Sequence, residues 1–391
     1  MKIRAIRATP VNIDYREPER WSQGHRLGIT GIVVEVETDA GITGLGESVP
    51  APSPEVTLAA IRSVTPLLLG RDPRQVTQRW RDLQTVGGFG AFPHTGNAAL
   101  AGIEIACWDI LGKSLGVPVH ALLGGRVRDT VEFMAFVPYH PDPARIEAEA
   151  RRFAAEGYRT LYIKGGFGEE NDLAAMNAMR AGGGPGLKLR MDPNENWTPD
   201  VALRMVHALK AFDVQYIEQP TRLDRLEELG VLRRRSPIPI AANQSSWLNH
   251  DILDIVTIGA ADLVMTDPWQ AGGIRAFHQA AHLCEVAGVQ LVYHSFAPLS
   301  IGTRAVMQVL ASSAACGYAH QTYHQMLVDD VVRDPVRHAG GIEPVDDRPG
   351  IGVELDPGKM QAAHARYLAQ GYLSAYAQED PRPMTRSAGP S

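Results

Sequence analysis

The sequence predicts an α/β protein in which a barrel of the (β/α)8 type follows a smaller α+β domain. From about residue 130, short apolar runs alternate with helical stretches, which is typical of a parallel βα repeat. Six of these runs end in a polar residue, and successive members of the set are 24 to 28 positions apart, about one βα unit. The six residues are Lys164, Asp192, Glu218, Asn243, Asp267 and His294.

The bulk properties fit a two-part globular protein that acts on a small molecule. A chain of 391 residues can hold one barrel and a second unit. The net charge of −6 and the lack of a basic stripe argue against a nucleic-acid partner, and no apolar run is long enough for a membrane span. The three cysteines have no metal-type spacing, and the N-terminus alternates like a strand rather than a signal peptide. We therefore expect free thiols and a cytoplasmic protein.

Residues 1–128 are expected to form the α+β domain. Two stretches, 1–14 and 30–48, alternate as strands and are separated by a polar loop over 15–29. The periodicity then becomes helical, most clearly over 97–116, where a glycine and a proline end the helix. Strands followed by helices favour a compact α+β unit.

Residues 129–345 are expected to form the barrel, whose eighth strand, near 317–322, has the weakest signal. The segment 346–377 contains a short helix near 357–370. The tail, 378–391, is rich in Pro, Ser and Arg and is expected to be disordered. The other seven strands are expected near 131–137, 160–164, 187–192, 214–218, 238–243, 262–267 and 289–294.

The ends of the middle strands predict a metal site. In a parallel barrel the C-terminal ends of the strands meet on one face, which carries the chemistry. Asp192 and Glu218 would therefore lie side by side, and Mg²⁺ prefers such hard oxygen ligands. Asn243, at the next strand end, can supply a third oxygen. The alternative is that the carboxylates cap helices or pair with arginine, but their register with Lys164 and Asn243 favours magnesium.

Three further strand ends predict acid–base groups. Lys164 and Tyr162 share a strand face, so both are expected to point into the barrel. A nearby cation favours the neutral form of a lysine, which is the form that a general base needs. Asp267 and His294 end consecutive strands, and a carboxylate on one ring nitrogen orients the other toward a substrate. The alternatives are a solvated lysine and a buried structural histidine.

This set of residues predicts the removal of a proton next to a substrate carboxylate. Mg²⁺ would stabilise the enediolate that forms. Lys164 and His294 come from different strands and are expected on opposite faces of the substrate. Two such groups permit either racemisation or the loss of a β-hydroxyl as water, and the residues alone leave both open.

Motifs in the first domain and the six strand-end residues form a specific combination. The motifs are Thr43-Gly44-Leu45-Gly46-Glu47, Gly102-Ile103-Glu104-Ile105-Ala106-Cys107-Trp108-Asp109 and Leu122-Leu123-Gly124-Gly125. With them, the chain resembles the enolase superfamily over about residues 1–372. The resemblance implies an α+β capping domain on a modified (β/α)7β barrel, with the C-terminal segment returning to the cap. It also implies that the polar loops at 15–29 and 50–55 close over the site.

Within that superfamily, the Asp–His pair resembles the mandelate racemase-like branches, and the chain looks most like the glucarate dehydratase subgroup. The stretch Lys164-Gly165-Gly166 is similar to the end of that group's Lys-x-Lys-Gly-Gly motif, although Tyr162 stands at the first lysine. The stretch from Asp192 to Trp197 is similar to the group's Asp-Pro-Asn-x-x-Trp motif.

The resemblance implies a role for each site residue. Asp192, Glu218 and Asn243 would bind the metal. Lys164 would be one acid–base group, and Asp267 with His294 the other. Asn194 would assist the enediolate or the leaving group. His320 stands where many relatives have a glutamate and is a candidate second acid.

Charge suggests which substrate the site would take. Asn243 is neutral, so the site is about one unit more positive than in relatives with three carboxylates, which favours a more negative substrate. We expect a hydroxylated diacid such as glucarate, with its far carboxylate bound by the polar loop; the alternative is that these side chains are solvated. The candidates for that contact are Arg16, Arg20, His25 and Arg26, and Tyr162 and His320 are further candidates for binding the substrate.

The sequence therefore predicts a Mg²⁺-dependent acid-sugar dehydratase that forms a 2-keto-3-deoxy product. One alternative is a racemase or epimerase that uses the same two acid–base groups. Another is a non-catalytic relative that binds an acid metabolite, although a retained base and dyad argue against binding alone. By analogy with such folds, we expect a homo-oligomer.

Overall fold

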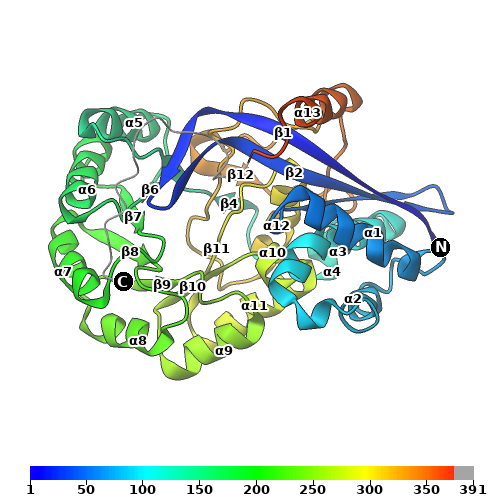
Figure 1. Cartoon of the computed structure of the whole chain (residues 1–391), viewed down its shortest axis with the longest axis horizontal. Coiled ribbons are helices and arrows are strands. Elements are labelled where there is room, and N and C mark those ends of the chain that lie inside the picture. The colour runs from blue at the N-terminus through cyan, green and yellow to red at the C-terminus, as the bar shows by residue number, and fades with distance from the viewer. Residues whose placement is uncertain (374–391) are drawn as a thin grey trace.

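The computed structural model describes residues 1–373, and the tail predicted to be disordered from residue 378 lies outside them. The first domain contains a three-stranded antiparallel sheet with four helices on it (Figure 1). The predicted helix over 97–116 is confirmed, and it begins slightly earlier. The elements are β1 (Ile3–Trp21), β2 (Gly24–Thr38), β3 (Thr43–Ser48), α1 (Pro54–Leu68), α2 (Val76–Thr85), α3 (Pro93–Leu115) and α4 (Val119–Leu122).

The polar stretch over 15–29 is not a loop, and that prediction was wrong. β1 and β2 continue through it as a long hairpin that turns between Trp21 and Gly24. The hairpin reaches from the first domain across to the barrel (Figure 1). Its outer backbone finds partners there, because Arg16 N–H donates to the Met326 carbonyl at 2.7 Å. These partners lie some 300 residues away along the sequence, so the local sequence pattern does not predict the strand.

The second domain is a parallel sheet of seven strands in sequential order from β5 to β11, curled into a barrel. Helices cover its outside, with α5 to α9 following one another around the left of Figure 1. The strands are β5 (Ala135–Val137), β6 (Thr160–Lys164), β7 (Lys188–Asp192), β8 (Val214–Glu218), β9 (Ile240–Ala242), β10 (Leu263–Thr266) and β11 (Gln290–Tyr293). The helices are α5 (Pro143–Ala155), α6 (Glu169–Gly183), α7 (Pro199–Leu209), α8 (Leu226–Arg235), α9 (Asn249–Ile258), α10 (Pro268–Ala271), α11 (Ile274–Ala287) and α12 (Ser300–Ser312).

The weak eighth strand closes the barrel without forming a regular strand. His320 N–H donates to the Glu132 carbonyl at 2.8 Å on one side, and Gln321 N–H donates to the Tyr293 carbonyl at 3.1 Å on the other. Phe133 and His320 form an isolated parallel bridge. The segment is too short for a ladder, which explains its weak signal. The result is a seven-stranded barrel closed by one bridging segment.

The C-terminal segment returns to the first domain, as the resemblance implies. β12 (Ile342–Pro344) pairs with β4 (Thr130–Glu132) at the base of the barrel. The predicted helix over 357–370 is confirmed as α13 (Pro357–Gln370), which lies along the β1–β2 hairpin (Figure 1). Beyond it, Leu373 N–H donates to Thr30 Oγ1 at 3.1 Å.

Two buried carboxylates from the first domain hold the barrel helices. Glu104 of α3 accepts hydrogen bonds from the Ile274 and Arg275 N–H groups at the start of α11, at 2.7 and 3.1 Å. Glu47 of β3 accepts from the Leu299 and Gly302 N–H groups at the start of α12, both at 2.9 Å. Helix N-termini have unpaired N–H groups and favour negative charge, so these contacts fix the two domains against each other.

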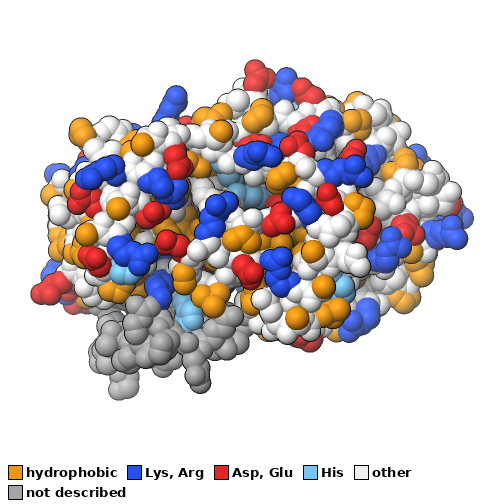
Figure 2. All heavy atoms as spheres, turned by 90° about the horizontal axis from the view of Figure 1, so that it is seen from above, with side chains coloured by type: hydrophobic (Ala, Val, Ile, Leu, Met, Phe, Trp, Pro, Cys, Tyr) orange, Lys and Arg blue, Asp and Glu red, His pale blue; other side chains and the backbone are white. Residues whose placement is uncertain are grey.

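The state of the cysteines and the distribution of surface charge agree with what the composition predicts. The three cysteines are buried and free. On the face shown in Figure 2, Lys and Arg side chains are interspersed with Asp and Glu. None of the helices within residues 1–373 has the length and apolarity that a membrane crossing requires.

The contact between β3 and α3 leads to a stability prediction. A Cβ on Gly46 would lie 1.9 Å from the Gly102 carbonyl oxygen, which belongs to the rigid backbone of α3. We expect Gly46→Ala to lower the free energy of unfolding by about 3 kcal/mol or more, since overpacking of this kind forces backbone shifts. Thermal or urea unfolding measures it. Gly186→Ala is the control, because a Cβ there meets nothing within 4 Å. If both substitutions lowered the free energy of unfolding equally, the close packing of β3 against α3 would not be its cause.

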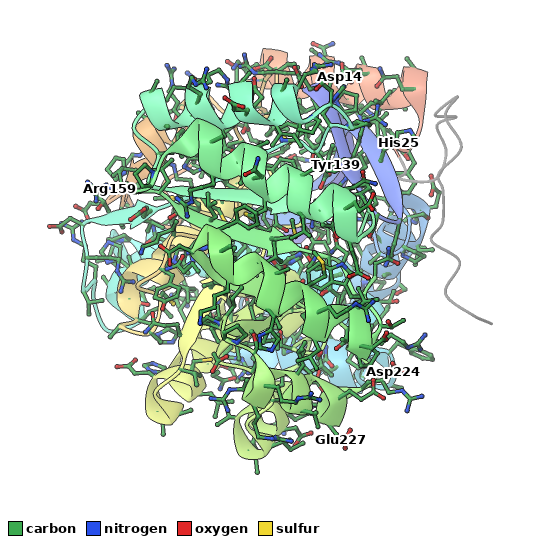
Figure 3. All side chains as sticks on the ribbon, turned by 90° about the vertical axis from the view of Figure 1, so that its left-hand side faces the viewer. Asp14, His25, Tyr139, Arg159, Asp224 and Glu227 are labelled. Atoms are coloured by element: carbon green, nitrogen blue, oxygen red, sulfur yellow. The ribbon has the colours of Figure 1, made fainter. Side chains whose placement is uncertain are left out.

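Glu104 leads to a prediction about pH. Burial raises the pKa of its carboxyl to about 7, against the opposing effect of its hydrogen bonds. A carboxyl whose pKa is higher in the folded state binds more protons there, so its contribution to stability is largest below about pH 4.5 and falls as the pH rises toward 7. We expect Glu104→Gln to flatten the fall in melting temperature over this range. The exposed Glu227 (Figure 3) gives the control Glu227→Gln, which should leave the slope unchanged.

Candidate active site

Three neighbouring strands bring Lys164, Asp192 and Glu218 together. The β6–β7 register pairs Lys164 with Asp192, and the β7–β8 register, which pairs Met191 with Ile217, places Glu218 beside Asp192. Lys164 is 7% exposed and the two carboxylates are fully buried. The parallel sheet therefore holds two acidic groups and one base away from bulk water.

Asp192 is held by hydrogen bonds from three sides. Its Oδ2 accepts from Lys164 Nζ at 2.7 Å and from the Tyr162 hydroxyl at 2.9 Å, and its Oδ1 accepts from Asn194 N–H at 2.8 Å. Burial, followed by the charges of Asp192 and Glu218, raises the pKa of the Tyr162 phenol well above its usual value. Tyr162 thus stays neutral, and it supports Asp192 as a hydrogen-bond donor where the similar motif has a lysine.

Glu218 has one satisfied and one unsatisfied oxygen. Its Oε2 accepts from Gln321 Nε2 at 2.7 Å, whereas its Oε1 is buried without a partner. Burial and the neighbouring Asp192 raise the pKa of the Glu218 carboxyl well above its usual value, and Lys164 and Arg190 oppose that shift. A buried oxygen that lacks a donor beside a second carboxylate is an arrangement that a bound cation would satisfy.

Asn243 can complete a cation site at this point. Its N–H donates to Gln219 Oε1 at 2.9 Å and its Nδ2 donates to the Met265 carbonyl at 3.2 Å, so the amide nitrogen is committed to the backbone and Oδ1 remains as the ligand atom. In the described part of the chain, no three Asp, Glu, His or Cys side chains form a metal-binding group. A cation bound here would therefore need the two carboxylates and a ligand of another type, and the amide oxygen of Asn243 is of that type.

Arg190 lies beneath the two carboxylates, and the sequence reasoning missed it. It is fully buried inside the barrel, where its guanidinium lies 4.5 Å from the Tyr216 ring centroid and its Nη1 donates to the Ala319 carbonyl at 2.6 Å. Arg190 stands two positions before Asp192 and therefore shares its strand face, and this spacing could have predicted that it points into the barrel. Arg190 places a permanent positive charge under the carboxylate pair.

The predicted Asp–His pair is present. His294 Nδ1 lies 2.7 Å from Asp267 Oδ2, while Asp267 Oδ1 accepts from the Trp269 and Gln270 N–H groups at 2.7 and 2.8 Å. The Trp269 indole in turn donates to the Glu47 carbonyl at 2.8 Å, which ties this turn to the first domain. Asp267 is thus an acceptor only, so Nδ1 carries the hydrogen and Nε2 is directed away from the dyad.

A cavity of about 290 Å³ joins these groups. Lys164, Asn194 and His294 line it from the barrel side, so both acid–base candidates face the same space. Asn194 has a left-handed backbone with φ of 49° and a buried Oδ1 that has no partner. Phe296, after β11, and Tyr323, after the segment that closes the barrel, also line it from the barrel side. The remaining lining comes from the hairpin, from the segment after β3 and from the C-terminal segment, and includes Glu19, Trp21, Arg26, Val49, Pro50 and Leu373.

Of the four cationic residues predicted to bind the substrate, only Arg26 lines this cavity. Arg16 Nε donates to the Leu327 carbonyl at 3.2 Å, and Arg16 and Arg20 line a different hollow beside α5. His25 lies on the hairpin near its turn (Figure 3) and does not border the cavity. The extended hairpin explains the difference, because alternate residues on a strand point to opposite faces.

His320 has a structural position rather than a place in the cavity. Its Nδ1 accepts from Tyr293 N–H at 3.0 Å and its Nε2 lies 3.3 Å from the Cys316 carbonyl. Burial lowers the pKa of the imidazole to about 3, so the ring stays neutral. The next residue, Gln321, is the one that contacts Glu218, and the sequence reasoning missed it. The sequence placed both residues in the eighth strand but did not decide which of them points into the barrel. In so short a strand, a register shift of one residue exchanges the inward and outward faces.

Family models match both domains. Residues 3–124 match the mandelate racemase/muconate lactonizing enzyme N-terminal domain, and residues 145–359 match the enolase C-terminal domain-like family. The two matches correspond to the first domain and to the barrel with its return segment. They confirm the resemblance that the motifs indicated.

Similar proteins cover nearly the whole chain. A probable glucarate dehydratase from Streptomyces coelicolor is 31% identical, with 94% of this chain and 92% of the relative covered. An N-succinyl-L-Arg/Lys racemase from Bacillus cereus is 27% identical, with 92% and 97% covered. A crystal structure of an enolase from Thermobispora bispora complexed with magnesium and formate is 32% identical, with a TM-score of 0.87 and coverage of 96% and 95%. These matches, the barrel and its capping domain establish that the chain belongs to the enolase superfamily, in which the similar proteins include both dehydratases and racemases.

Proposed function

We propose that the protein is a Mg²⁺-dependent acid-sugar dehydratase. The observation that carries the proposal is the cavity lined by both Lys164 and a His294 held by Asp267, next to two buried carboxylates. Two acid–base groups on different strands can act on two atoms of one substrate. The likeness to a probable glucarate dehydratase over 94% of the chain supports a dehydratase in particular.

The proposed reaction is a β-elimination of water from a hydroxylated carboxylate. One of Lys164 and His294 takes the proton from the carbon next to the carboxylate. The bond from the β-carbon to its hydroxyl breaks, and the other group donates the proton that converts the leaving hydroxyl to water. The resulting enol becomes a 2-keto-3-deoxy acid. Asn194 would orient the leaving group or the enediolate, and its Oδ1, buried without a partner at the cavity wall, supports this role.

Asp192, Glu218 and Asn243 are the residues that would hold the magnesium ion. When bound, the ion supplies positive charge that stabilises the enediolate. The unpartnered Glu218 Oε1 and the fixed amide of Asn243 support this assignment. The likeness to an enolase structure complexed with magnesium and formate supports it further.

Racemisation or epimerisation is the second candidate. It needs the same two groups, one to remove the proton and one to return a proton on the opposite face. The likeness to an N-succinyl-L-Arg/Lys racemase over 92% of this chain supports this candidate. A binding protein without catalysis has less support, since a buried lysine and a positioned histidine are not needed for binding alone.

The acid–base assignment predicts a result in deuterium oxide. We expect the protein with Mg²⁺ to convert one or more acid sugars to 2-keto-3-deoxy products, seen by proton NMR. Lys164→Ala and His294→Asn should each lower kcat at least about 100-fold, the usual contribution of a positioned acid or base. Lys188→Ala is the control, because Lys188 is exposed at the start of β7.

Other outcomes of that experiment separate the candidates. Exchange of the α-proton without loss of water, or with inversion, would favour the epimerase. Unchanged exchange in both variants would refute the roles of Lys164 and His294. No exchange with any acid would leave the binding protein as the remaining candidate.

The metal assignment predicts a change in stability. We expect Mg²⁺ to raise the melting temperature of the protein, since a ligand at 100 times its dissociation constant stabilises by about 2.7 kcal/mol. Glu218→Gln should remove that rise. The variant without Mg²⁺ should be at least as stable as the parent, because burial and the neighbouring Asp192 raise the pKa of Glu218 and so disfavour its charged form, which glutamine lacks. Glu227→Gln, on the exposed start of α8, should respond to Mg²⁺ as the parent does. An equal rise in all three proteins would contradict the assignment.

A further inference from the structure

The cavity wall formed by the hairpin contains an ion pair in addition to Lys164–Asp192. Glu19 and Arg26 face each other across the hairpin, where the β1–β2 register pairs them directly. Arg26 Nε and Nη2 both donate to Glu19 Oε2, at 2.7 and 2.5 Å. Both residues line the cavity, and the Glu19 side chain is only 2% exposed. The cation on this wall therefore already has a carboxylate partner.

Aromatic rings hold Arg26 in that position. Its guanidinium carbon lies 5.5 Å from the Trp21 ring centroid and 5.8 Å from the Tyr323 ring centroid. Both rings also line the cavity. An arginine that is ion-paired and in contact with two rings loses stabilising contacts if it turns toward a substrate carboxylate. Arg26 is thus a fixed part of the wall rather than a free anion receptor.

Glu19 also changes the charge balance of the cavity. The neutral Asn243 suggested a site one unit more positive than a three-carboxylate site, but Glu19 returns one negative charge to the same cavity. Three cationic side chains, Lys164, Arg26 and the Arg190 beneath the carboxylate pair, accompany the four carboxylates of Glu19, Asp192, Glu218 and Asp267. With a divalent cation the set carries one positive charge, which the first substrate carboxylate neutralises, so none remains for a second.

We propose that the Glu19–Arg26 pair selects monocarboxylic acid sugars, whose far end carries hydroxyl groups, over the corresponding diacids. The proposal rests on the proposed function and revises the diacid expected from the sequence. A hydroxyl can donate to Glu19 and accept from Arg26 without disturbing the pair. A second carboxylate would meet the buried charge of Glu19 and would be repelled, since like charges in a poorly solvated site interact strongly.

The test uses matched pairs of acids with the same configuration, an aldonate and its aldarate. For each pair, kcat/KM is measured with Mg²⁺ for the parent, Glu19→Gln and Arg26→Gln. We expect the parent to favour the aldonate at least tenfold. Glu19→Gln frees the cation and should shift the ratio at least tenfold toward the aldarate. Arg26→Gln exposes the Glu19 charge and should shift it further toward the aldonate.

A control on the same strand separates position from charge. Glu17 is 49% exposed, pairs with Arg145 at 3.7 Å and does not line the cavity, so Glu17→Gln should leave the ratio unchanged. A parent preference for aldarates, or a ratio that neither cavity variant moves, would overturn the proposal. The dehydratase assignment would stand in that case, because turnover itself would be observed.

Binding measurements keep the two proposals distinguishable. Calorimetric titration of the same matched acids, with Mg²⁺ present, reports the charge preference whether or not any acid is turned over. Tighter binding of aldonates without turnover would support the selection by Glu19 and Arg26 and contradict the dehydratase. Tighter binding of aldarates would overturn the selection.

Discussion

The site depends on one constraint, the parallel register that forces Asp192 and Glu218 to end adjacent strands inside a barrel closed to water. Two carboxylates in such a place repel each other and lack solvent. The surrounding residues compensate for this cost. Lys164 and Tyr162 donate to Asp192, Gln321 donates to Glu218, and Arg190 lies below the pair. One oxygen, Glu218 Oε1, is left without a partner, and this unpaired oxygen is the structural basis of the proposed cation site.

The first domain contributes to this site through contacts far from the cavity. Glu47 binds the start of α12 through its side chain and the Trp269 indole through its carbonyl, and Trp269 follows the dyad residue Asp267. Glu104 holds the start of α11. The same domain extends the hairpin that brings Glu19 and Arg26 to the cavity. One half of the protein thus fixes the proposed acid–base groups and also forms the cavity wall that would meet the far end of a substrate.

Much of this arrangement could be predicted from the sequence, because strand ends and helix periodicity are local signals. The six strand-end residues and the helices over 97–116 and 357–370 follow from them, whereas the return of the C-terminal segment was implied by the family resemblance. The hairpin extension could not be predicted, since its backbone partners lie some 300 residues away. The Glu19–Arg26 pair depends on the position of the hairpin turn, and the choice between His320 and Gln321 depends on a one-residue register. Domain boundaries and the expected homo-oligomer stay predictions.

The most direct test of the central claim is the location of a divalent cation by anomalous diffraction, from crystals grown with Mn²⁺ in place of Mg²⁺. The account predicts one strong peak in contact with the free oxygen of Glu218, with Asp192 and with the amide oxygen of Asn243. A peak at this position would show that the unpaired carboxylate oxygen of Glu218 binds a metal. A cation at another position, or Glu218 paired with a side chain and no peak beside it, would contradict the account.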